Sequence, residues 1–398
     1  MLAVAGVAFT NTGVWGSRRA GLSLNRIASE SSADSPRDGD RGLDRAMSTH
    51  MRHLLQKLEQ IRAKPDCRTF ILADAKDPDM TWGIPSFGES HASQAGAEGK
   101  DQPQGFRSAR EFLEETRSVV RQGVIDIMLA SVSTMDALAH RERLFEVSEV
   151  TPAVRINDTT DIWCQRGTRY RRSPSAPFST AYIEEAQFGN LTASRAGAPV
   201  VNLGLYSMTF NNDLEADLRT LTAFRQFRAE AARLGFRYFL EVFAPNWAET
   251  GLSAGQVPDF VNDQITRTLA GVPSSGRPLF LKIPYFGPGP LEDLVAYDPS
   301  VVVGVLGGSS GTTYDAFKLL AEAQKYGARA ALFGRKIKAS EQPLVFIQML
   351  RSIADGDLGP EEAVRAYHGE LDKEGIPPKR PLEEDLRLTA AEMSYISA

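Results

Sequence analysis

The sequence has only two cysteines, Cys67 and Cys164, which lie far apart, and its five histidines do not have the spacing of metal ligands. This excludes a disulfide framework and a cysteine-based metal motif. No apolar run approaches the roughly 18 residues that a membrane helix requires. Because 45 basic and 50 acidic residues give a net charge of −5, the chain also lacks the positive field typical of nucleic-acid-binding proteins. These absences predict a cytoplasmic protein with no metal site, no cofactor, and neither nucleic acid nor membrane as a partner.

The two ends of the 398-residue chain differ from its middle. Residues 1–14 are small and apolar, without the preceding basic residue of a secretory signal, and residues 31–45 are rich in Ser, Asp, Arg and Gly. We expect residues 1–46 to be a disordered or mis-assigned N-terminal extension. The folded domain is expected to span 47–372. The tail at 373–398 is expected to form a surface helix or a contact in a homo-oligomer.

Between these ends, short apolar runs alternate with amphipathic stretches. Eight runs have the composition of buried strands: 69–74, 124–129, 151–157, 198–203, 238–243, 279–285, 301–306 and 328–333. Helical spacing is found at 53–61, 109–120, 134–145, 214–234, 258–269, 314–326, from 343 onward, and at 359–370. This alternation predicts the α/β class and a (β/α)₈ TIM barrel, with long insertions after the first and third strands. A doubly wound open sheet is the alternative, but no G-x-G-x-x-G motif follows the first strand.

A single lysine, Lys282, interrupts the apolar run at 279–285. A strand buried on both faces tolerates an ammonium group only if the charge is paired or the amine is neutral. A neutral amine is a nucleophile that forms a Schiff base with a carbonyl compound. Lys282 is therefore either a catalytic nucleophile or part of a structural ion pair inside the sheet.

Strand alternation indicates which polar side chains share the barrel interior with Lys282. On the fifth strand, Glu241 is predicted to face inward, next to the lysine strand. On the first strand, placing Ile71 and Ala73 outward turns Asp74 inward. On the third, the same reasoning predicts that Arg155 and Asn157 point inward. One amine and two carboxylates, Lys282, Glu241 and Asp74, then form a candidate catalytic set for Schiff-base chemistry, unless the carboxylates only neutralise the buried cations.

Two glycine-rich turns follow the last two predicted strands. The residues that they offer to a ligand are Gly307, Gly308 and Ser309 in the first turn and Gly334 and Arg335 in the second. Glycine lets backbone N–H groups approach an anion, a following helix N-terminus adds a favourable dipole, and arginine can bind two phosphate oxygens at once. We therefore predict that these residues bind a substrate phosphate.

A cluster of arginines lies in the insertion after the third strand. Arg166, Arg169, Arg171 and Arg172 surround Tyr170. The cluster is either solvated surface charge or a lid over an anionic substrate.

The run at 281–285, the Gly307-Gly308-Ser309 turn and the segment 334–337 together resemble the class I (Schiff-base) aldolases of the archaeal-type fructose-bisphosphate and tagatose-bisphosphate aldolase group. The resemblance extends in order and spacing from about residue 69 to residue 350. It implies metal-independent aldol cleavage of a phosphorylated ketose, with Lys282 as the Schiff-base residue. Asp74 and Glu241 match acidic positions of the tagatose-bisphosphate branch, and both glycine turns match the phosphate site of the family.

Two positions depart from the family pattern. The third strand carries Arg155 and Asn157 where the tagatose-bisphosphate branch has a lysine. On the fifth strand, Glu241 or Phe243 stands where some archaeal-type members have a tyrosine.

The sequence thus favours an aldolase that acts on a phosphorylated sugar or keto acid. One alternative is a phosphosugar isomerase or epimerase in which Asp74 and Glu241 are an acid–base pair and Lys282 acts only through its charge. The other is a non-catalytic barrel that binds a phosphorylated metabolite.

Overall fold

A computed structural model describes residues 48–393 except 65, 89–104, 193–196 and 309–310. The N-terminal extension predicted at 1–46 lies outside the described residues. No helix in the described ranges is both long and apolar enough to cross a membrane.

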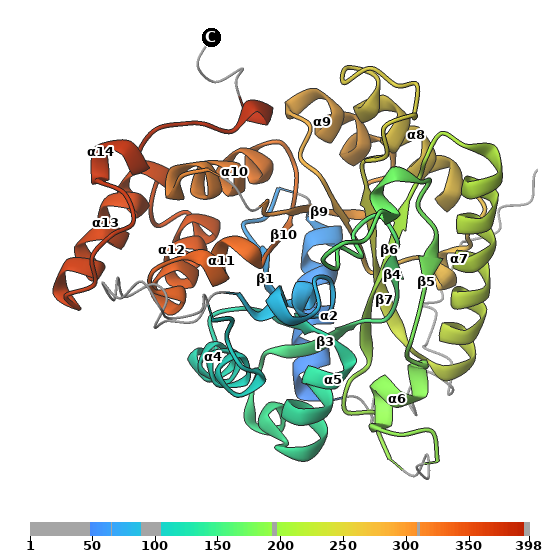
Figure 1. Ribbon diagram of the computed structural model, residues 1–398, viewed down its shortest axis with the longest axis horizontal. Coiled ribbons are helices and arrows are strands. Elements are labelled where there is room, and N and C mark those ends of the chain that lie inside the picture. Colours follow the sequence, from blue (N-terminus) through green and yellow to red (C-terminus); the bar gives the residue numbers. More distant parts are fainter. Residues whose placement is uncertain (1–47, 65, 89–104, 193–196, 309–310, 394–398) are drawn as a thin grey trace, which may run out of the picture. The chain divides into compact units, whose positions relative to one another are not determined.

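Eight parallel strands close into a barrel, which confirms the predicted (β/α)₈ fold (Figure 1). They are β1 (Ile71–Ala75), β2 (Ile127–Ala130), β3 (Thr151–Arg155), β6 (Leu203–Thr209), β7 (Arg237–Phe243), β8 (Phe280–Ile283), β9 (Val302–Leu306) and β10 (Ala330–Phe333). The first strand pairs with the last, and each of the others pairs with its two neighbours along the chain.

Helices cover the outside of the barrel (Figure 1). They are α4 (Ala109–Gln122), α5 (Val132–Met135), α7 (Leu214–Leu234), α8 (Val257–Ala270), α9 (Pro288–Tyr297), α10 (Thr313–Lys325) and α12 (Pro343–Asp355). Four further helices are α2 (Thr49–Ala63), α6 (Ile183–Phe188), α11 (Arg335–Ala339) and α13 (Pro360–Lys373), and a short α14 spans Leu382–Asp385. The sequence does not predict α9, because the first turn of this helix, Pro-Gly-Pro, has the composition of a loop.

Alternate residues of each strand pack in two separate cores. Inside the barrel, Phe239 and Phe280 stack with ring centroids 4.5 Å apart. The apolar face of α2, including Leu54 and Leu58, belongs to this inner core. Because Arg62 of α2 also donates to the carbonyl of Leu279, just before β8, α2 closes the N-terminal end of the barrel. The open end is therefore the C-terminal one, where barrel enzymes place their active sites.

The fourth strand differs from its prediction at 198–203. The observed strand, β6, spans Leu203–Thr209, so all but the last residue of the predicted run precede the strand. The apolar pattern of β6 is interrupted by Gly204, Ser207 and Thr209, so its composition does not identify it as a buried strand. The glycine is required by packing, since a Cβ at Gly204 would lie 2.5 Å from the ring of Phe236.

The two insertions meet at the C-terminal end of the barrel. The insertion after β3 contains a small antiparallel pair, β4 (Asp158–Thr159) with β5 (Pro177–Phe178). Trp163 packs between Tyr170 and Phe178, at centroid distances of 4.8 and 4.9 Å. The N–H of Cys164 donates to the carbonyl of Thr81, which follows β1, at 3.0 Å. The insertions therefore support each other beside the barrel mouth.

Candidate active site

Lys282 and Glu241 lie side by side on β8 and β7, where they are register partners. Both side chains point into the barrel, since Phe280 and Phe239, two residues earlier on each strand, belong to the inner core. The Lys282 Nζ is 2.7 Å from Glu241 Oε1, and the two side chains are only 6% and 2% exposed. The structure thus places this predicted pair in direct contact, at a distance suited to proton transfer.

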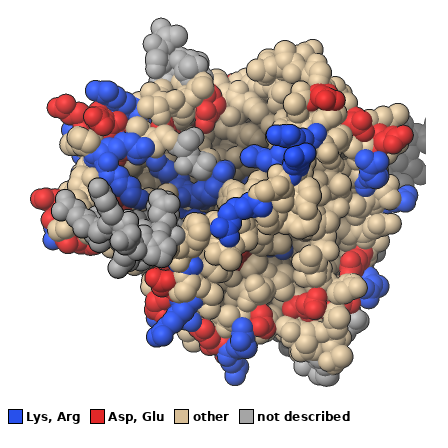
Figure 2. All heavy atoms as spheres, viewed as in Figure 1, with Lys and Arg blue, Asp and Glu red and all other residues tan. Residues whose placement is uncertain are grey.

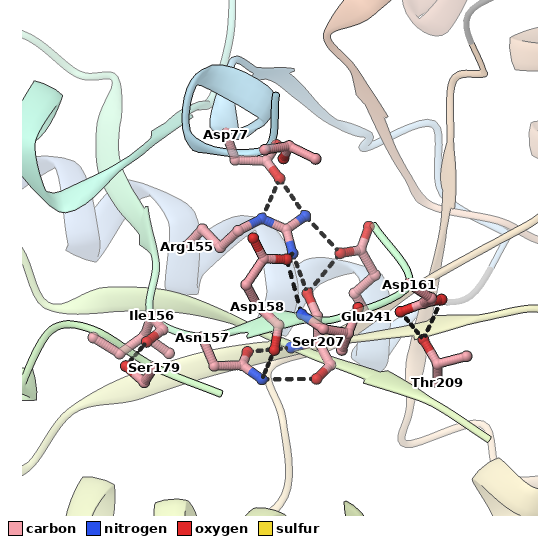
Figure 3. A network of polar contacts seen from close by, with 12 residues as sticks. Asp77, Arg155, Ile156, Asn157, Asp158, Asp161, Ser179, Ser207, Thr209 and Glu241 are labelled. Atoms are coloured by element: carbon pink, nitrogen blue, oxygen red, sulfur yellow. Dashed lines mark hydrogen bonds and ion pairs between the residues drawn. The ribbon is translucent and has the colours of Figure 1, made fainter. Parts of the chain in front are cut away.

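A chain of alternating charges continues from Glu241 (Figure 3). Arg155 of β3 donates through Nη2 to Glu241 Oε2 at 2.9 Å, and through Nε to Asp77 Oδ2 at 2.7 Å. The hydroxyl of Ser207 donates to Glu241 Oε2 at 2.7 Å and accepts from Arg155 Nη1 at 2.7 Å. Arg155 therefore points inward as predicted and fixes two carboxylates, one of which, Asp77, the sequence analysis missed.

Asp74 does not join this set. On β1 the inward residues are Ala73 and Ala75, and Leu72 packs in the outer core, so the predicted orientation of the strand is wrong. The Asp74 side chain lies between the barrel and α4, where Lys76 Nζ approaches it to 3.1 Å and contacts Glu115 of α4 at 2.7 Å. Burial raises the pKa of Asp74 to about 6. Asp74 is therefore a buried partner of Lys76.

Asp77 takes the place that the sequence analysis gave to Asp74. It lies on a short 3₁₀ turn, Asp77–Met80, directly after β1. Burial alone would raise its pKa, but the positive charges of Lys282 and Arg155 outweigh burial and hold the pKa below its usual value. Within the described part of the chain, Asp77 Oδ1 is buried and has no hydrogen-bond partner. An ionised carboxylate with one oxygen free for a ligand is suited to act as a base.

Asn157 and Asp158 lie just beyond the end of β3. Asn157 exchanges two hydrogen bonds with the backbone of Ser207, at 2.9 and 2.6 Å, and so joins β3 to β6. It does not line the cavity that contains Lys282. Burial raises the pKa of Asp158 to about 6, although Arg155 Nη1 lies 3.8 Å from it. Of the two predicted inward residues of this segment, only Arg155 therefore reaches the cavity.

A cavity of about 420 Å³ opens above Lys282. Besides Lys282, Glu241, Arg155 and Asp77, its lining includes Trp82, Arg171, Phe243, Asn246, Gly307, Gly308, Gly334 and Arg335. Both predicted glycine turns and Arg335 thus border the same cavity as the lysine. Ser309 lies outside the described residues. Figure 2 shows lysine and arginine side chains around a hollow on the face viewed.

The two glycine turns follow the barrel wall closely. A Cβ at Gly307 would lie 2.1 Å from the ring of Phe333, and one at Gly334 would lie 1.7 Å from the carbonyl oxygen of Ala75. The N–H of Gly307 donates to Leu332 at 2.9 Å and so continues the strand pairing. Backbone contacts to an anion would therefore begin at Gly308, not at Gly307.

The helix that follows the first turn is not free to bind an anion. Asp315 and Asp385 accept the N–H groups of Thr312 and Thr313, each at 2.7 Å, at the N-terminus of α10. From the sequence, the dipole of this helix is predicted to assist anion binding. Because carboxylates of the protein already occupy these N–H groups, that expectation is wrong for the first turn of α10.

Arg171 and Trp82 come from the two insertions. Arg171 is exposed but lines the cavity, which favours the interpretation that part of the arginine cluster faces the ligand. The guanidinium of Arg335 lies over Trp82, 6.0 Å from the ring centroid. Burial lowers the pKa of Arg335, and the charge of Arg171 acts in the same direction. An anion between the two arginines would relieve this repulsion.

Three comparisons with known proteins bear on this arrangement. No model of a known protein family matches the chain, and no curated protein is similar to it in sequence.

No group of three or more His, Cys, Asp or Glu side chains in the described ranges is arranged to hold a metal ion.

The third comparison, with solved structures, does find proteins that resemble this chain. An archaeal fructose 1,6-bisphosphate aldolase superposes with a TM-score of 0.51 at 15% identity, over 75% of this chain and 99% of its own. A fructose-bisphosphate aldolase from Slackia heliotrinireducens gives a TM-score of 0.56 at 16% identity, over 81% and 90%. An archaeal fructose-1,6-bisphosphate aldolase whose catalytic lysine is bound covalently to the carbinolamine intermediate gives 0.51 at 15% identity, over 75% and 100%. At such low identity these similarities establish the fold that this chain shares with Schiff-base aldolases.

Proposed function

We propose that this protein is a class I aldolase, which makes or breaks a carbon–carbon bond in a phosphorylated ketose or keto acid through a Schiff base on Lys282. The observation that carries the proposal is the position of Lys282: a buried amine 2.7 Å from a carboxylate, in a cavity that Gly308 and Arg335 also line. An amine needs such a carboxylate to exchange protons while an imine forms.

Glu241 supports the first half of the reaction. It takes a proton from Lys282, whose neutral nitrogen attacks the substrate carbonyl to give a carbinolamine. The same carboxyl group returns a proton to the departing hydroxyl, so that water leaves and an iminium ion forms. Arg155 and Ser207 hold Glu241 Oε2, which leaves Oε1 directed at Lys282.

Asp77 supports the second half. Its free Oδ1 accepts the proton of the substrate hydroxyl next to the breaking bond. The electrons of that bond move to the iminium nitrogen, the aldehyde product leaves, and an enamine remains on Lys282. Protonation of the enamine carbon and hydrolysis of the imine then release the second product and restore the lysine.

Borohydride reduction tests this proposal. Incubation with dihydroxyacetone phosphate and borohydride should leave a stable adduct on Lys282, located by peptide mass spectrometry. Glycerol 3-phosphate, which has no carbonyl group, is the matched control and should leave none. Absence of an adduct across a panel of phosphorylated ketoses and keto acids would contradict the proposal.

One observation favours a second candidate. The Lys282–Glu241 contact is also a complete ion pair, and a permanently charged lysine would suit an isomerase or epimerase that uses Glu241 and Asp77 as its acid and base. Such an enzyme would interconvert phosphosugars without forming a trapped adduct.

Arg335 is expected to bind the phosphate of the substrate. Replacing it by glutamine should raise KM for a phosphorylated substrate about tenfold to a hundredfold, because a charge-assisted hydrogen-bond pair is lost, and should change kcat little. Steady-state kinetics would measure this. Arg169→Gln, an exposed arginine that does not line the cavity, is the matched control. An unchanged KM in Arg335→Gln would place the phosphate elsewhere.

A further inference from the structure

We infer that a second cavity, at the end of the barrel opposite the candidate active site, binds the phosphate group of a small phosphorylated metabolite. This arginine cavity, lined by Arg62, Arg228, Arg237 and Arg277, has a volume of about 390 Å³. That volume is within the range of pockets that hold small organic ligands. The inference stands apart from the Schiff-base proposal, because the arginine cavity shares no lining residue with the cavity above Lys282.

The arginine cavity lies beside the N-terminal ends of three strands. Its lining includes Arg237, the first residue of β7, Leu279, directly before β8, and Val301, directly before β9. Arg62 belongs to α2, the helix that closes this end of the barrel, and Arg228 belongs to α7. Because the barrel strands are parallel, the cavity is at the end of the barrel away from the candidate active site.

The positive charge of this cavity is only partly neutralised. No aspartate or glutamate among the described residues lines it. Arg277 forms an ion pair with Asp298. Arg62 and Arg228 form no ion pair within the described ranges. At least two guanidinium groups therefore line the cavity without a carboxylate partner, which matches the charge of about −1.5 to −2 that a phosphate monoester carries near pH 7.

Arg62 is held in place by uncharged groups. Its Nη2 donates to the carbonyl of Leu279 at 2.7 Å, and its Nε donates to the carbonyl of Ser300 at 3.3 Å. The Ser300 hydroxyl accepts from Arg277 at 3.3 Å, so the two arginines contact the same serine. Burial lowers the pKa of Arg62, although the charge of Glu59 acts in the opposite direction. These bonds fix the guanidinium group and leave its charge available to an anion.

Arg228 approaches the cavity from α7. Its guanidinium group lies over the ring of Phe224, 5.4 Å from the centroid. Its Nε is buried and has no hydrogen-bond partner within the described part of the chain. A Cβ at Gly276 would lie 3.1 Å from Arg228 Nη1, so this arginine is next to the residue that precedes Arg277. A partly buried, unpaired charge costs free energy, which a bound anion would offset.

The segment before β8 shapes the cavity in the absence of a ligand. The hydroxyl of Tyr238 donates to the carbonyl of Gly276 at 2.8 Å and so fixes the short 3₁₀ turn Ser274–Gly276. Ser275 is exposed and also lines the cavity, whereas Tyr238 and Pro278 add apolar surface for a carbon skeleton. A site that is already formed loses little free energy to ordering when a ligand binds.

Calorimetry with glycerol 3-phosphate tests this site, since the probe has a phosphate group and no carbonyl group. The titrations use full-length Arg335→Gln, in which anion binding above Lys282 is expected to be weak. Adding Arg228→Gln should raise the dissociation constant about tenfold to a hundredfold, because hydrogen bonds to a charged group are lost. Arg225→Gln, an exposed arginine on α7 that does not line the cavity, is the matched control and should leave the constant unchanged.

A second variant, Ser275→Glu, keeps all four arginines. Its carboxylate should pair with them and raise the dissociation constant by a similar factor. Inorganic phosphate is the second probe. It should bind at least severalfold more weakly than glycerol 3-phosphate, because it has no carbon skeleton to pack against Tyr238 and Pro278. Neither variant should change borohydride trapping on Lys282 in an otherwise wild-type protein.

The inference would be overturned if Arg335→Gln bound no glycerol 3-phosphate at millimolar concentration, or bound it equally well with and without Arg228→Gln and Ser275→Glu. Equal affinity for the two probes would overturn the assignment to a metabolite. A parallel loss of trapping would show that the variants disturb the whole barrel, and would also count against the site. Weakened binding in both variants of a protein that shows no trapping would support this site and contradict the Schiff-base proposal.

Discussion

Replacing Lys282 by arginine should lower the rate of carbon–carbon bond cleavage by about a thousandfold or more and abolish the borohydride-trapped adduct, because a guanidinium group forms no imine. Arginine is preferable to methionine here. It keeps a positive charge beside Glu241, whereas methionine would leave this buried carboxylate with Arg155 alone, a positive charge that it shares with Asp77. Two measurements follow the two effects: single-turnover cleavage of a phosphorylated ketose that forms the adduct in the wild type, and mass spectrometry of the borohydride-reduced protein.

The matched control for this change is Lys318→Arg on α10, where the lysine forms an ion pair with Glu322 outside the cavity. It should leave both activity and trapping unchanged. Interconversion of phosphosugars by both the wild type and Lys282→Arg, without bond cleavage, would favour the isomerase or epimerase, in which the lysine contributes only its charge.

The second large effect is expected at Asp77. Asp77→Asn should lower the cleavage rate about a hundredfold to ten-thousandfold, the range for loss of a general base, while an adduct on Lys282 still forms. The reason is that imine formation relies on Glu241, whereas bond cleavage needs a group that accepts the hydroxyl proton. Comparison of the trapping rate with the cleavage rate separates the two steps.

Asp74→Asn is the informative comparison, because Asp74 is only three residues away and equally buried. Asp74→Asn should lower the free energy of unfolding by about 1–3 kcal/mol, because the contact with Lys76 is weakened. It should leave the cleavage rate close to that of the wild type. Urea unfolding and steady-state kinetics measure these quantities. A large loss of activity in Asp74→Asn, with Asp77→Asn fully active, would reverse the assignment.

The sequence was sufficient for the barrel and for its last three strands. Lys282 interrupts the apolar run of its strand, and Gly307 and Gly334 directly follow theirs. Residues that break or end an apolar pattern are easily recognised. The pairing of Lys282 with Glu241 also followed from the sequence. Alternation of side chains along each strand placed both residues inside the barrel, on neighbouring strands.

Three other features could not be derived in this way. β1 is buried on both faces, so the run Ile-Leu-Ala-Asp-Ala offers no polar alternation from which its orientation could be determined. Asp77 lies on a turn after the strand, where its direction depends on Arg155, a residue distant in the sequence. The only signal in the sequence for a role of Asp77 was that it is a carboxylate in the first loop at the C-terminal edge of the barrel. The range predicted for β6 was wrong because Gly204 weakens the strand signal of its composition. The glycine is there because only it leaves room for the ring of Phe236.

The direct pairing of β1 with β10 has a consequence for biosynthesis. Asp77 follows the first strand and Arg335 the last, so the two groups can face one cavity only after nearly the whole polypeptide has left the ribosome. Until then the cavity around Glu241, Arg155 and Lys282 has no closed wall, and the three side chains are open to water. The cavity that the proposed chemistry requires is therefore complete only when β1 and β10 have paired.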